Sequence, residues 1–230
     1  MTISNSYGNR NDEKSVTRDR TLVIDRSRRV IYLTKKKLLP EDVIAFNFAK
    51  VLEKNEIRYV IVAGYTAILF GRARRSDDID FIIKEIDESR FVELCKRLQE
   101  EGFTMMQGDI TDEESVRGVY REYLTKGYSI RFIYRDTILP NIEVKIARTS
   151  IHRYALAHSI KTVINNEFVI RISPLELQIA YKLYMGSEKD IGDAVFLYTL
   201  FKNHIDHKEI EEWCKRLRVN CKALKEIDKL

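Results

Sequence analysis

The chain has little of what marks several classes of protein. Only three of its 230 residues are cysteine, namely Cys95, Cys214 and Cys221. No two of them have C-x-x-C spacing and their number is odd, so the sequence predicts neither a disulfide framework nor a zinc site. No apolar run approaches the roughly 20 residues that span a bilayer, and the polar N-terminus lacks the hydrophobic segment of a signal peptide. We therefore expect a cytoplasmic protein with no membrane partner.

The residues that are present suit a globular protein with an ionic surface. Hydrophobic residues make up 44% of the chain, enough for a normal core, and charged residues make up 33%. The net charge of +5 permits a polyanionic partner such as RNA, or a triphosphate substrate. A solvated surface slightly rich in lysine explains the same excess equally well.

The sequence pattern divides the chain into three parts. Residues 1–19 are polar and lack periodicity, so we expect a disordered tail. Residues 20–172 mix strands with helices, and residues 173–230 are typical of three or four helices. This order predicts an α+β fold with a helical C-terminal lobe. The expected strands lie in a hairpin over 21–33 and at 59–63, 78–83, 129–134, 142–147, 161–164 and 167–172, with a turn at Pro140 and Asn141.

The expected strand over 59–63 stops at Gly64, and a short helix follows at once. The unpaired N–H groups and the positive dipole at the start of a helix are a natural seat for phosphate oxygens. A glycine there lets the backbone approach a ligand closely. We therefore expect phosphate groups to bind against Gly64, Tyr65 and Thr66.

Two acids stand at the start of the next expected strand. Asp78 and Asp80 are two residues apart, so both carboxylates point to the same side of the strand. A strand face with two carboxylates is costly unless a cation neutralises them, and Mg²⁺ or Mn²⁺ prefers such oxygen ligands. The neighbours Ile79, Phe81 and Ile82 indicate a buried strand, which favours a metal site over the alternative of a solvated edge or a turn cap.

These residues together resemble a known signature. The hydrophobic strand, Gly64, the short helix and the Asp-Ile-Asp motif are similar to the signature of the DNA polymerase beta-like nucleotidyltransferase superfamily. The run over 75–80 resembles the form found in its abortive-infection (AbiEii-type) toxin and minimal nucleotidyltransferase branch. The resemblance implies a mixed sheet flanked by helices, an NTP substrate, and catalysis by Asp78 and Asp80. Tyr65 departs from the Gly or Ser of the signature, and its bulk is expected to crowd a triphosphate, although its backbone N–H stays available.

A second motif lies downstream, in the stretch ISPLELQIAYKLYMGSEKDIGDAVFLY. In the same branch, a late lysine followed by Lys/Arg-Asp-x-x-Asp lies on two helices beside the active site. The resemblance implies catalytic roles for Lys182, Lys189 and Asp193, with Arg75 helping to offset phosphate charge. Structural alternatives are also open. Asp190 can stabilise a helix start, and the aliphatic part of Lys182 can lie along apolar neighbours while its ammonium group reaches solvent.

Enzymes of this superfamily usually draw a third carboxylate from a neighbouring strand. Glu143, flanked by branched apolar residues, is our candidate for a third metal ligand beside Asp78 and Asp80. Asp136, in the expected turn region, is the alternative. A half-buried strand with a solvated polar face would look the same, since Glu143 and Lys145 share one face by alternation.

The resemblance therefore implies a Mg²⁺-dependent nucleotidyltransferase that transfers NMP from an NTP to a hydroxyl group and releases pyrophosphate. In the toxin branch the acceptor is RNA, often the tRNA 3′ end, and a cognate antitoxin is a partner. Protein and small-molecule hydroxyls are alternative acceptors. The competing hypothesis is a catalytically degenerate protein that binds nucleotide or RNA without turnover.

Overall fold

The computed structural model describes residues 13–17, 20–25, 27–221 and 224. Within this part ten strands form one mixed sheet, in the order β1-β2-β3-β9-β10-β4-β5-β8-β7-β6. The pairs β3–β9, β10–β4 and β5–β8 are parallel, and the other neighbours are antiparallel. The strands are β1 (Glu13–Thr17), β2 (Arg20–Asp25), β3 (Val30–Lys35), β4 (Tyr59–Val62), β5 (Asp78–Ile83), β6 (Phe103–Met105), β7 (Ile130–Tyr134), β8 (Thr137–Ile146), β9 (Ile160–Ile164) and β10 (Phe168–Ile172).

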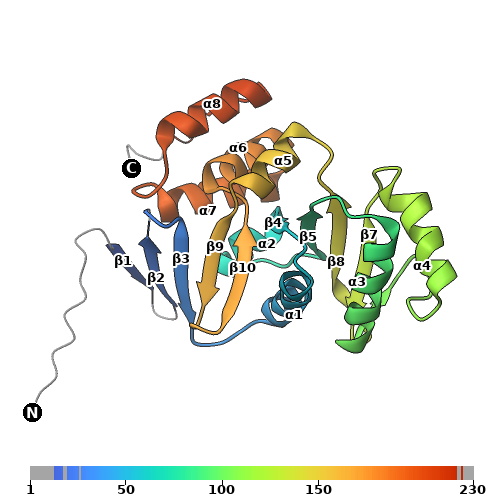
Figure 1. Ribbon diagram of the computed structural model, residues 1–230. Helices are drawn as coiled ribbons and strands as arrows, with labels where there is room; N and C mark the ends of the chain where they lie inside the picture. The colour runs from blue at the N-terminus through green and yellow to red at the C-terminus, as the bar shows by residue number, and fades with distance from the viewer. Residues whose placement is uncertain (1–12, 18–19, 26, 222–223, 225–230) are drawn as a thin grey trace, which may run out of the picture.

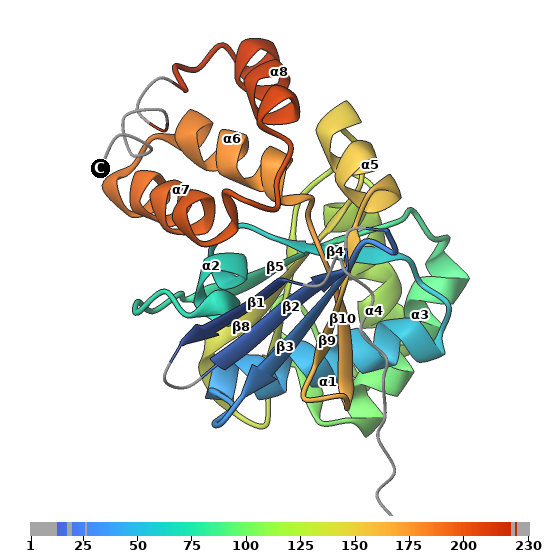
Figure 2. The same cartoon turned by 90° about the vertical axis from the view of Figure 1, so that its left-hand side faces the viewer.

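Helices flank the sheet in two groups, which Figures 1 and 2 show from two sides. The first group contains α1, which contacts β8, β10 and α3. In the second group α6 packs against α7 and α8, and α7 contacts α2. The predicted mixed sheet flanked by helices, with helices gathered toward the C-terminus, is confirmed. The helices are α1 (Pro40–Lys54), α2 (Gly64–Phe70), α3 (Glu88–Glu100), α4 (Glu113–Val119), the π-helix η1 (Tyr120–Leu124), α5 (Ser150–Ala157), α6 (Leu175–Met185), α7 (Glu188–Phe201) and α8 (His207–Leu217).

An aromatic core lies between α1 and the sheet. The ring centroid of Phe48 in α1 lies 5.0 Å from that of Phe81, 5.2 Å from that of Phe103 and 5.5 Å from that of Phe132. Each of these four side chains is almost completely buried. Because side chains alternate along a strand, Phe81 on this face of β5 places Asp80 on the opposite face, where α5 contacts β5.

Two local expectations differ from the structure. Pro140 and Asn141 lie inside β8, and the turn after β7 is at Arg135 and Asp136, which both have positive φ. The side-chain amide of Asn141 donates to the carbonyl of Asp77 at 3.1 Å. Where a disordered tail was expected, residues 13–17 form β1 and pair with β2; residues 1–12 and 18–19 lie outside the described residues. The division into a catalytic domain and a lobe at residue 173 stays a prediction.

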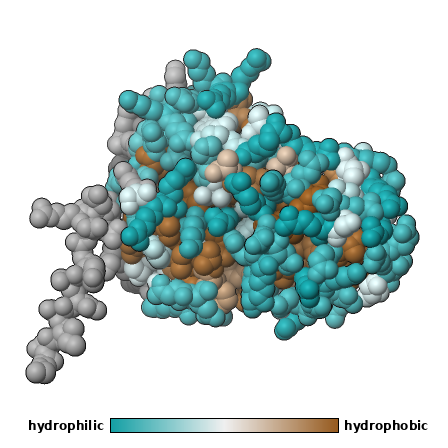
Figure 3. Space-filling model, in the orientation of Figure 1, coloured by the Kyte–Doolittle hydropathy of each residue, from teal (hydrophilic) through white to brown (hydrophobic). Residues whose placement is uncertain are grey.

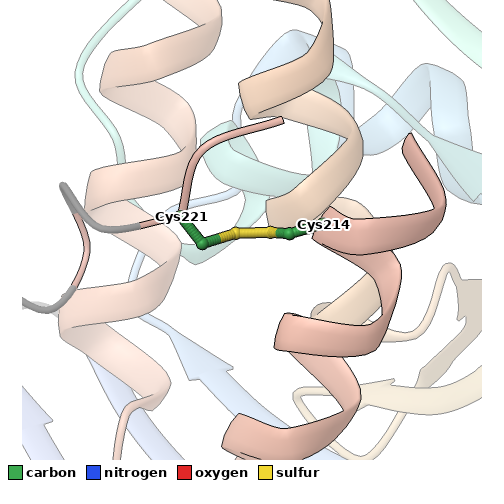
Figure 4. The surroundings of a disulfide bond; sticks show 2 residues. All are labelled: Cys214 and Cys221. Carbon is green, nitrogen blue, oxygen red and sulfur yellow. A yellow bond between two sulfur atoms is a disulfide. The ribbon is translucent and has the colours of Figure 1, made fainter. Parts of the chain in front are cut away.

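The sequence predicts no disulfide framework, and among the described residues the structure contains one local disulfide that the sequence does not predict. A disulfide joins Cys214 in α8 to Cys221, and their Cα atoms are 6.2 Å apart (Figure 4). Arg218 ends the helix in the left-handed conformation, with φ of 57°, and turns the chain back. The seven-residue spacing gives no sign of this turn, so the sequence does not predict that the two cysteines pair.

The surface in Figure 3 is largely hydrophilic, and hydrophobic residues show in separate places on that face. Among the described residues, no helix combines the length and the apolar character that a bilayer crossing requires.

Candidate active site

A cavity of about 340 Å³ opens where β4 passes into α2. Ala63 joins the two elements with φ of 60° and ψ of −137°, a conformation that is strained for a residue with a side chain. Its carbonyl accepts a hydrogen bond from Nε2 of Gln178 at 2.7 Å. An added Cβ at Gly64 would lie 2.4 Å from Nη2 of Arg74. The strained turn and the missing side chain thus hold the start of α2 against the cavity, with Arg74 packed close to it.

Asp78 and Asp80 both line this cavity from β5, as their two-residue spacing predicts. Burial and then the charge of Asp78 raise the pKa of Asp80 to about 7. The pKa of a carboxyl group rises in this way when too little positive charge lies near its ionised form. A divalent cation supplies that positive charge. The two acids therefore fit Mg²⁺ or Mn²⁺ and would hold it between them. Across the described residues, no group of three or more His, Cys, Asp or Glu side chains is placed to hold a metal ion.

Glu143 lies beside this pair but is already bound to cations. The parallel register of β5 and β8 puts it opposite Asp80. Its Oε2 lies 2.9 Å from Nη2 of Arg131, and its Oε1 lies 2.5 Å from Nζ of Lys145. Burial raises the pKa of Glu143, but the hydrogen bonds from Lys145 and Arg131 outweigh it, and the pKa falls below its usual value. Lys145 lines the cavity and Glu143 does not. Asp136, the alternative third acid, lies in the β7–β8 turn away from the cavity.

The two lysines of the downstream motif reach the cavity from α6 and α7. Lys182 and Lys189 both line it, together with Asp190. Lys182 is buried, and its Nζ lies 2.6 Å from Oδ1 of Asp190. Ser187 caps α7, and its hydroxyl also contacts Asp190. The structural interpretation of Asp190 as part of a helix start is therefore confirmed, while the catalytic roles of the lysines stay predictions.

Asp193 is completely buried and does not line the cavity. Its carboxylate gathers three cations: Arg72 Nε at 2.8 Å, Arg74 Nη2 at 2.6 Å and Lys182 Nζ at 3.0 Å. The arginines come from the loop after α2 and the lysine from α6. Asp193 therefore joins the loop to the helices and orients cations at the cavity wall, so its expected catalytic role would act through those cations.

Three residues expected to contact phosphate have side chains outside the cavity. Tyr65 is completely buried, and its hydroxyl donates to Oδ1 of Asp42 at 2.8 Å. Burial and then the charge of Asp42 raise the pKa of Tyr65 well above its usual value. The tyrosine thus fills the core and does not crowd a triphosphate. The hydroxyl of Thr66 is buried as well, with no hydrogen-bond partner among the described residues. Arg75 is exposed outside the cavity, and Arg74 lines it instead.

Among the polar residues that line the cavity, Lys145, Gln178 and His152 received no role from the sequence pattern. Lys145 was detectable, because alternation puts it on the same face as Glu143. Gln178 was detectable as a polar residue in an otherwise apolar helix. His152 had no signal, since α5 was not predicted. Burial and then the charge of Lys145 lower the pKa of its ring.

Comparisons with protein-family models and with curated proteins find no match for the chain. Among solved structures, it is similar to an antigenic nucleotidyltransferase-like protein from Paracoccidioides brasiliensis, with 17% identity, a TM-score of 0.48, and coverage of 76% of this chain and 85% of that chain. Two structures of the antibiotic-resistance factor ANT(2'')-Ia are also similar. The solution structure has 11% identity, a TM-score of 0.45, and coverage of 81% and 96%. The crystal structure with adenylyl-2"-tobramycin has 16% identity, a TM-score of 0.44, and coverage of 75% and 93%.

Proposed function

We propose that the chain is a metal-dependent nucleotidyltransferase, which transfers NMP from an NTP to a hydroxyl acceptor and releases pyrophosphate. The observation that carries the proposal is the pair of carboxylates of Asp78 and Asp80, which face a cavity whose other charged side chains include Arg74, Lys145 and Lys182. Two adjacent acids bind a divalent cation, and surrounding cations bind phosphate oxygens. The same cavity therefore suits a metal-bound triphosphate.

Each group of residues has a definite task in this reaction. Asp78 and Asp80 would hold the cation, which when bound would neutralise phosphate charge and lower the pKa of the acceptor hydroxyl. Gly64, which has no side chain, leaves room for the guanidinium of Arg74 at the start of α2, and Arg74 would donate hydrogen bonds to phosphate oxygens. Lys182 and Lys189 offset the remaining negative charge. The acceptor oxygen bonds to the α-phosphorus, the bond from that phosphorus to the bridging oxygen breaks, and pyrophosphate leaves while the hydroxyl proton passes to solvent.

The direct test uses the D78N/D80N double variant with each of the four labelled NTPs and Mg²⁺. We expect label transfer and pyrophosphate release to be lost, with a thermal midpoint equal to or above that of the parent protein. The control variant is D77N, because Asp77 is exposed and adjacent to the pair. Transfer that survives in the double variant would refute the assignment. Calorimetry that shows nucleotide binding by the parent without pyrophosphate release would favour the non-catalytic alternative.

As acceptor we propose RNA, in keeping with the expectation of a tRNA-directed toxin. The supporting observation is an exposed aromatic pair on α6 at the cavity: Tyr181 lines the cavity, and its ring centroid lies 5.7 Å from that of Tyr184. Exposed aromatic rings beside cations stack the bases of single-stranded nucleic acid. Incubation with labelled NTP and total RNA should label RNA. The Y181A/Y184A variant should label RNA more weakly than the parent, while both release pyrophosphate equally when water is the acceptor. Label found only on protein or on small molecules would refute RNA as the acceptor.

A further inference from the structure

A lysine on the neighbouring strand β8 lies near Asp80, two residues along from the position directly opposite it. In the parallel pair β5–β8, Asp80 is opposite Glu143 and Ile82 is opposite Lys145. Side chains at these positions share the face that looks into the cavity. The Nζ atom of Lys145 lies 3.9 Å from Oδ1 of Asp80 and 2.5 Å from Oε1 of Glu143. An ammonium group therefore lies between the two acids.

Glu143 has no free oxygen for a metal in this arrangement. Oε1 contacts Lys145, and Oε2 contacts Nε and Nη2 of Arg131 at 3.2 Å and 2.9 Å. The carboxylate is buried, with an exposed fraction of 6%. Ligation of a second ion by Glu143 would need Lys145 to leave, and the ammonium and the ion would repel each other. The geometry instead makes Glu143 a positioning residue that fixes Lys145.

We propose that the site holds a single divalent cation, on Asp78 and Asp80, and that Lys145, fixed by Glu143, is a phosphate-binding residue that supplies the second positive charge. This inference rests on the proposed function, and it says which residues bind the triphosphate of the NTP. Lys145 is well placed for the task, because it lines the cavity and its side chain is 40% exposed. An ammonium on a fixed partner can donate its other protons to phosphate oxygens.

The test uses inorganic tripolyphosphate, which carries the phosphate chain without a base, together with Mn²⁺. Equilibrium dialysis against a matched solution of Mn²⁺ and tripolyphosphate counts the ions bound to the protein, and calorimetry gives the affinity for tripolyphosphate. We expect one Mn²⁺ per chain at saturating tripolyphosphate. K145Q should weaken tripolyphosphate binding about tenfold, as for the loss of one charge-assisted hydrogen bond, while K145R retains most of it. The matched control K84Q, at an exposed lysine that follows β5, should bind like the parent.

Glu143 gives an independent test of the arrangement. E143Q should weaken tripolyphosphate binding, because Lys145 loses its fixed partner, and should still bind one Mn²⁺ with unchanged affinity when tripolyphosphate is absent. Two Mn²⁺ per chain in the parent, with one lost in E143Q, would overturn the inference in favour of a third metal ligand. Unchanged tripolyphosphate affinity in K145Q would overturn it as well. If Mn²⁺ binding survives in D78N/D80N, the proposed function itself fails, which is a separate outcome. Circular dichroism spectra and thermal midpoints verify that each variant folds.

Discussion

The pKa of Asp80 makes the acidic pair testable through the stability of the metal-free protein. Burial and the charge of Asp78 raise this pKa from its ordinary value of 3.8 to about 7. A carboxyl whose pKa is higher in the folded state favours folding while it is protonated, and this contribution is lost as pH rises through the folded-state pKa. Above pH 7 the folded protein therefore contains an ionised, buried Asp80 beside Asp78. The replacement D80N removes that cost and keeps the shape of the side chain.

The free-energy cost of ionising Asp80 in the folded protein follows from its two pKa values. The difference between 3.8 and about 7 corresponds to a destabilisation of about 4 kcal/mol once Asp80 is ionised in both states. At pH 5 only the unfolded state is mostly ionised, so most of the cost is absent. Relative to the parent, D80N should gain roughly 3 kcal/mol in free energy of unfolding between pH 5 and pH 9. The side chain of Asp80 is 20% exposed, which limits the screening by solvent.

The assay is urea unfolding of both proteins in a chelating buffer at pH 5, 6, 7, 8 and 9. The control variant D77N removes one carboxylate from an exposed position and should show a difference from the parent that is flat with pH. Millimolar Mg²⁺ at pH 8 should stabilise the parent and leave D80N almost unchanged, because a ligand stabilises only the state that binds it. A difference between D80N and the parent that stays constant from pH 5 to pH 9 would refute the reasoning about the pair.

Three further predictions concern residues around the cavity. D193N should destabilise the protein by about 3 kcal/mol in guanidinium unfolding, because the buried cations lose their compensating charge; a loss below 0.5 kcal/mol would contradict the role of Asp193 as their anchor. G64A should lower tripolyphosphate affinity in calorimetry, because the new Cβ forces Arg74 to move, and unchanged affinity would show that this contact is irrelevant to binding. Y65F should lower the free energy of unfolding by about 1 to 2 kcal/mol, because one hydrogen bond to the buried carboxylate of Asp42 is lost. Nucleotide affinity should be unchanged; a large change in affinity would mean that Tyr65 reaches the ligand.

Alternation along a strand is the part of the site that the sequence determines best. A period of two puts Asp78 and Asp80 on one face whatever the rest of the chain does, and the strand over 78–83 was predicted with its observed bounds. The partner strand is harder, because β5 and β8 are about sixty residues apart and their parallel register follows from the packing of the whole sheet. Glu143 was therefore found as a candidate, but its ion pairs with Arg131 and Lys145 were not.

Loops and side-chain directions limited the remaining predictions. Arg75 was expected to offset phosphate charge, yet Arg75 is exposed and the loop after Gly71 turns its neighbour Arg74 toward Asp193. Tyr65 looked obstructive because a linear motif does not tell which side of a short helix faces the core. The buried carboxylate of Asp42 binds its hydroxyl from α1, a contact between residues 23 positions apart that no local pattern reveals.

The distribution of ion pairs explains why Asp78 and Asp80, and not the other acids nearby, are the metal candidates. Asp193 and Asp190 compensate the cations of the helices and the loop, and Glu143 compensates Arg131 and Lys145 at 2.9 Å or less. By contrast, the shortest contact described for Asp78 is the hydroxyl of Ser76 at 3.5 Å, and for Asp80 it is Lys145 at 3.9 Å. Among the described residues, the pair therefore has one salt-bridge partner, Lys145, at the long distance of 3.9 Å, and most of its charge is uncompensated. A divalent cation relieves that charge more completely than a proton on one carboxylate does. The same ion pairs that occupy both oxygens of Glu143 therefore leave Asp78 and Asp80 as the pair that we propose as the metal ligands.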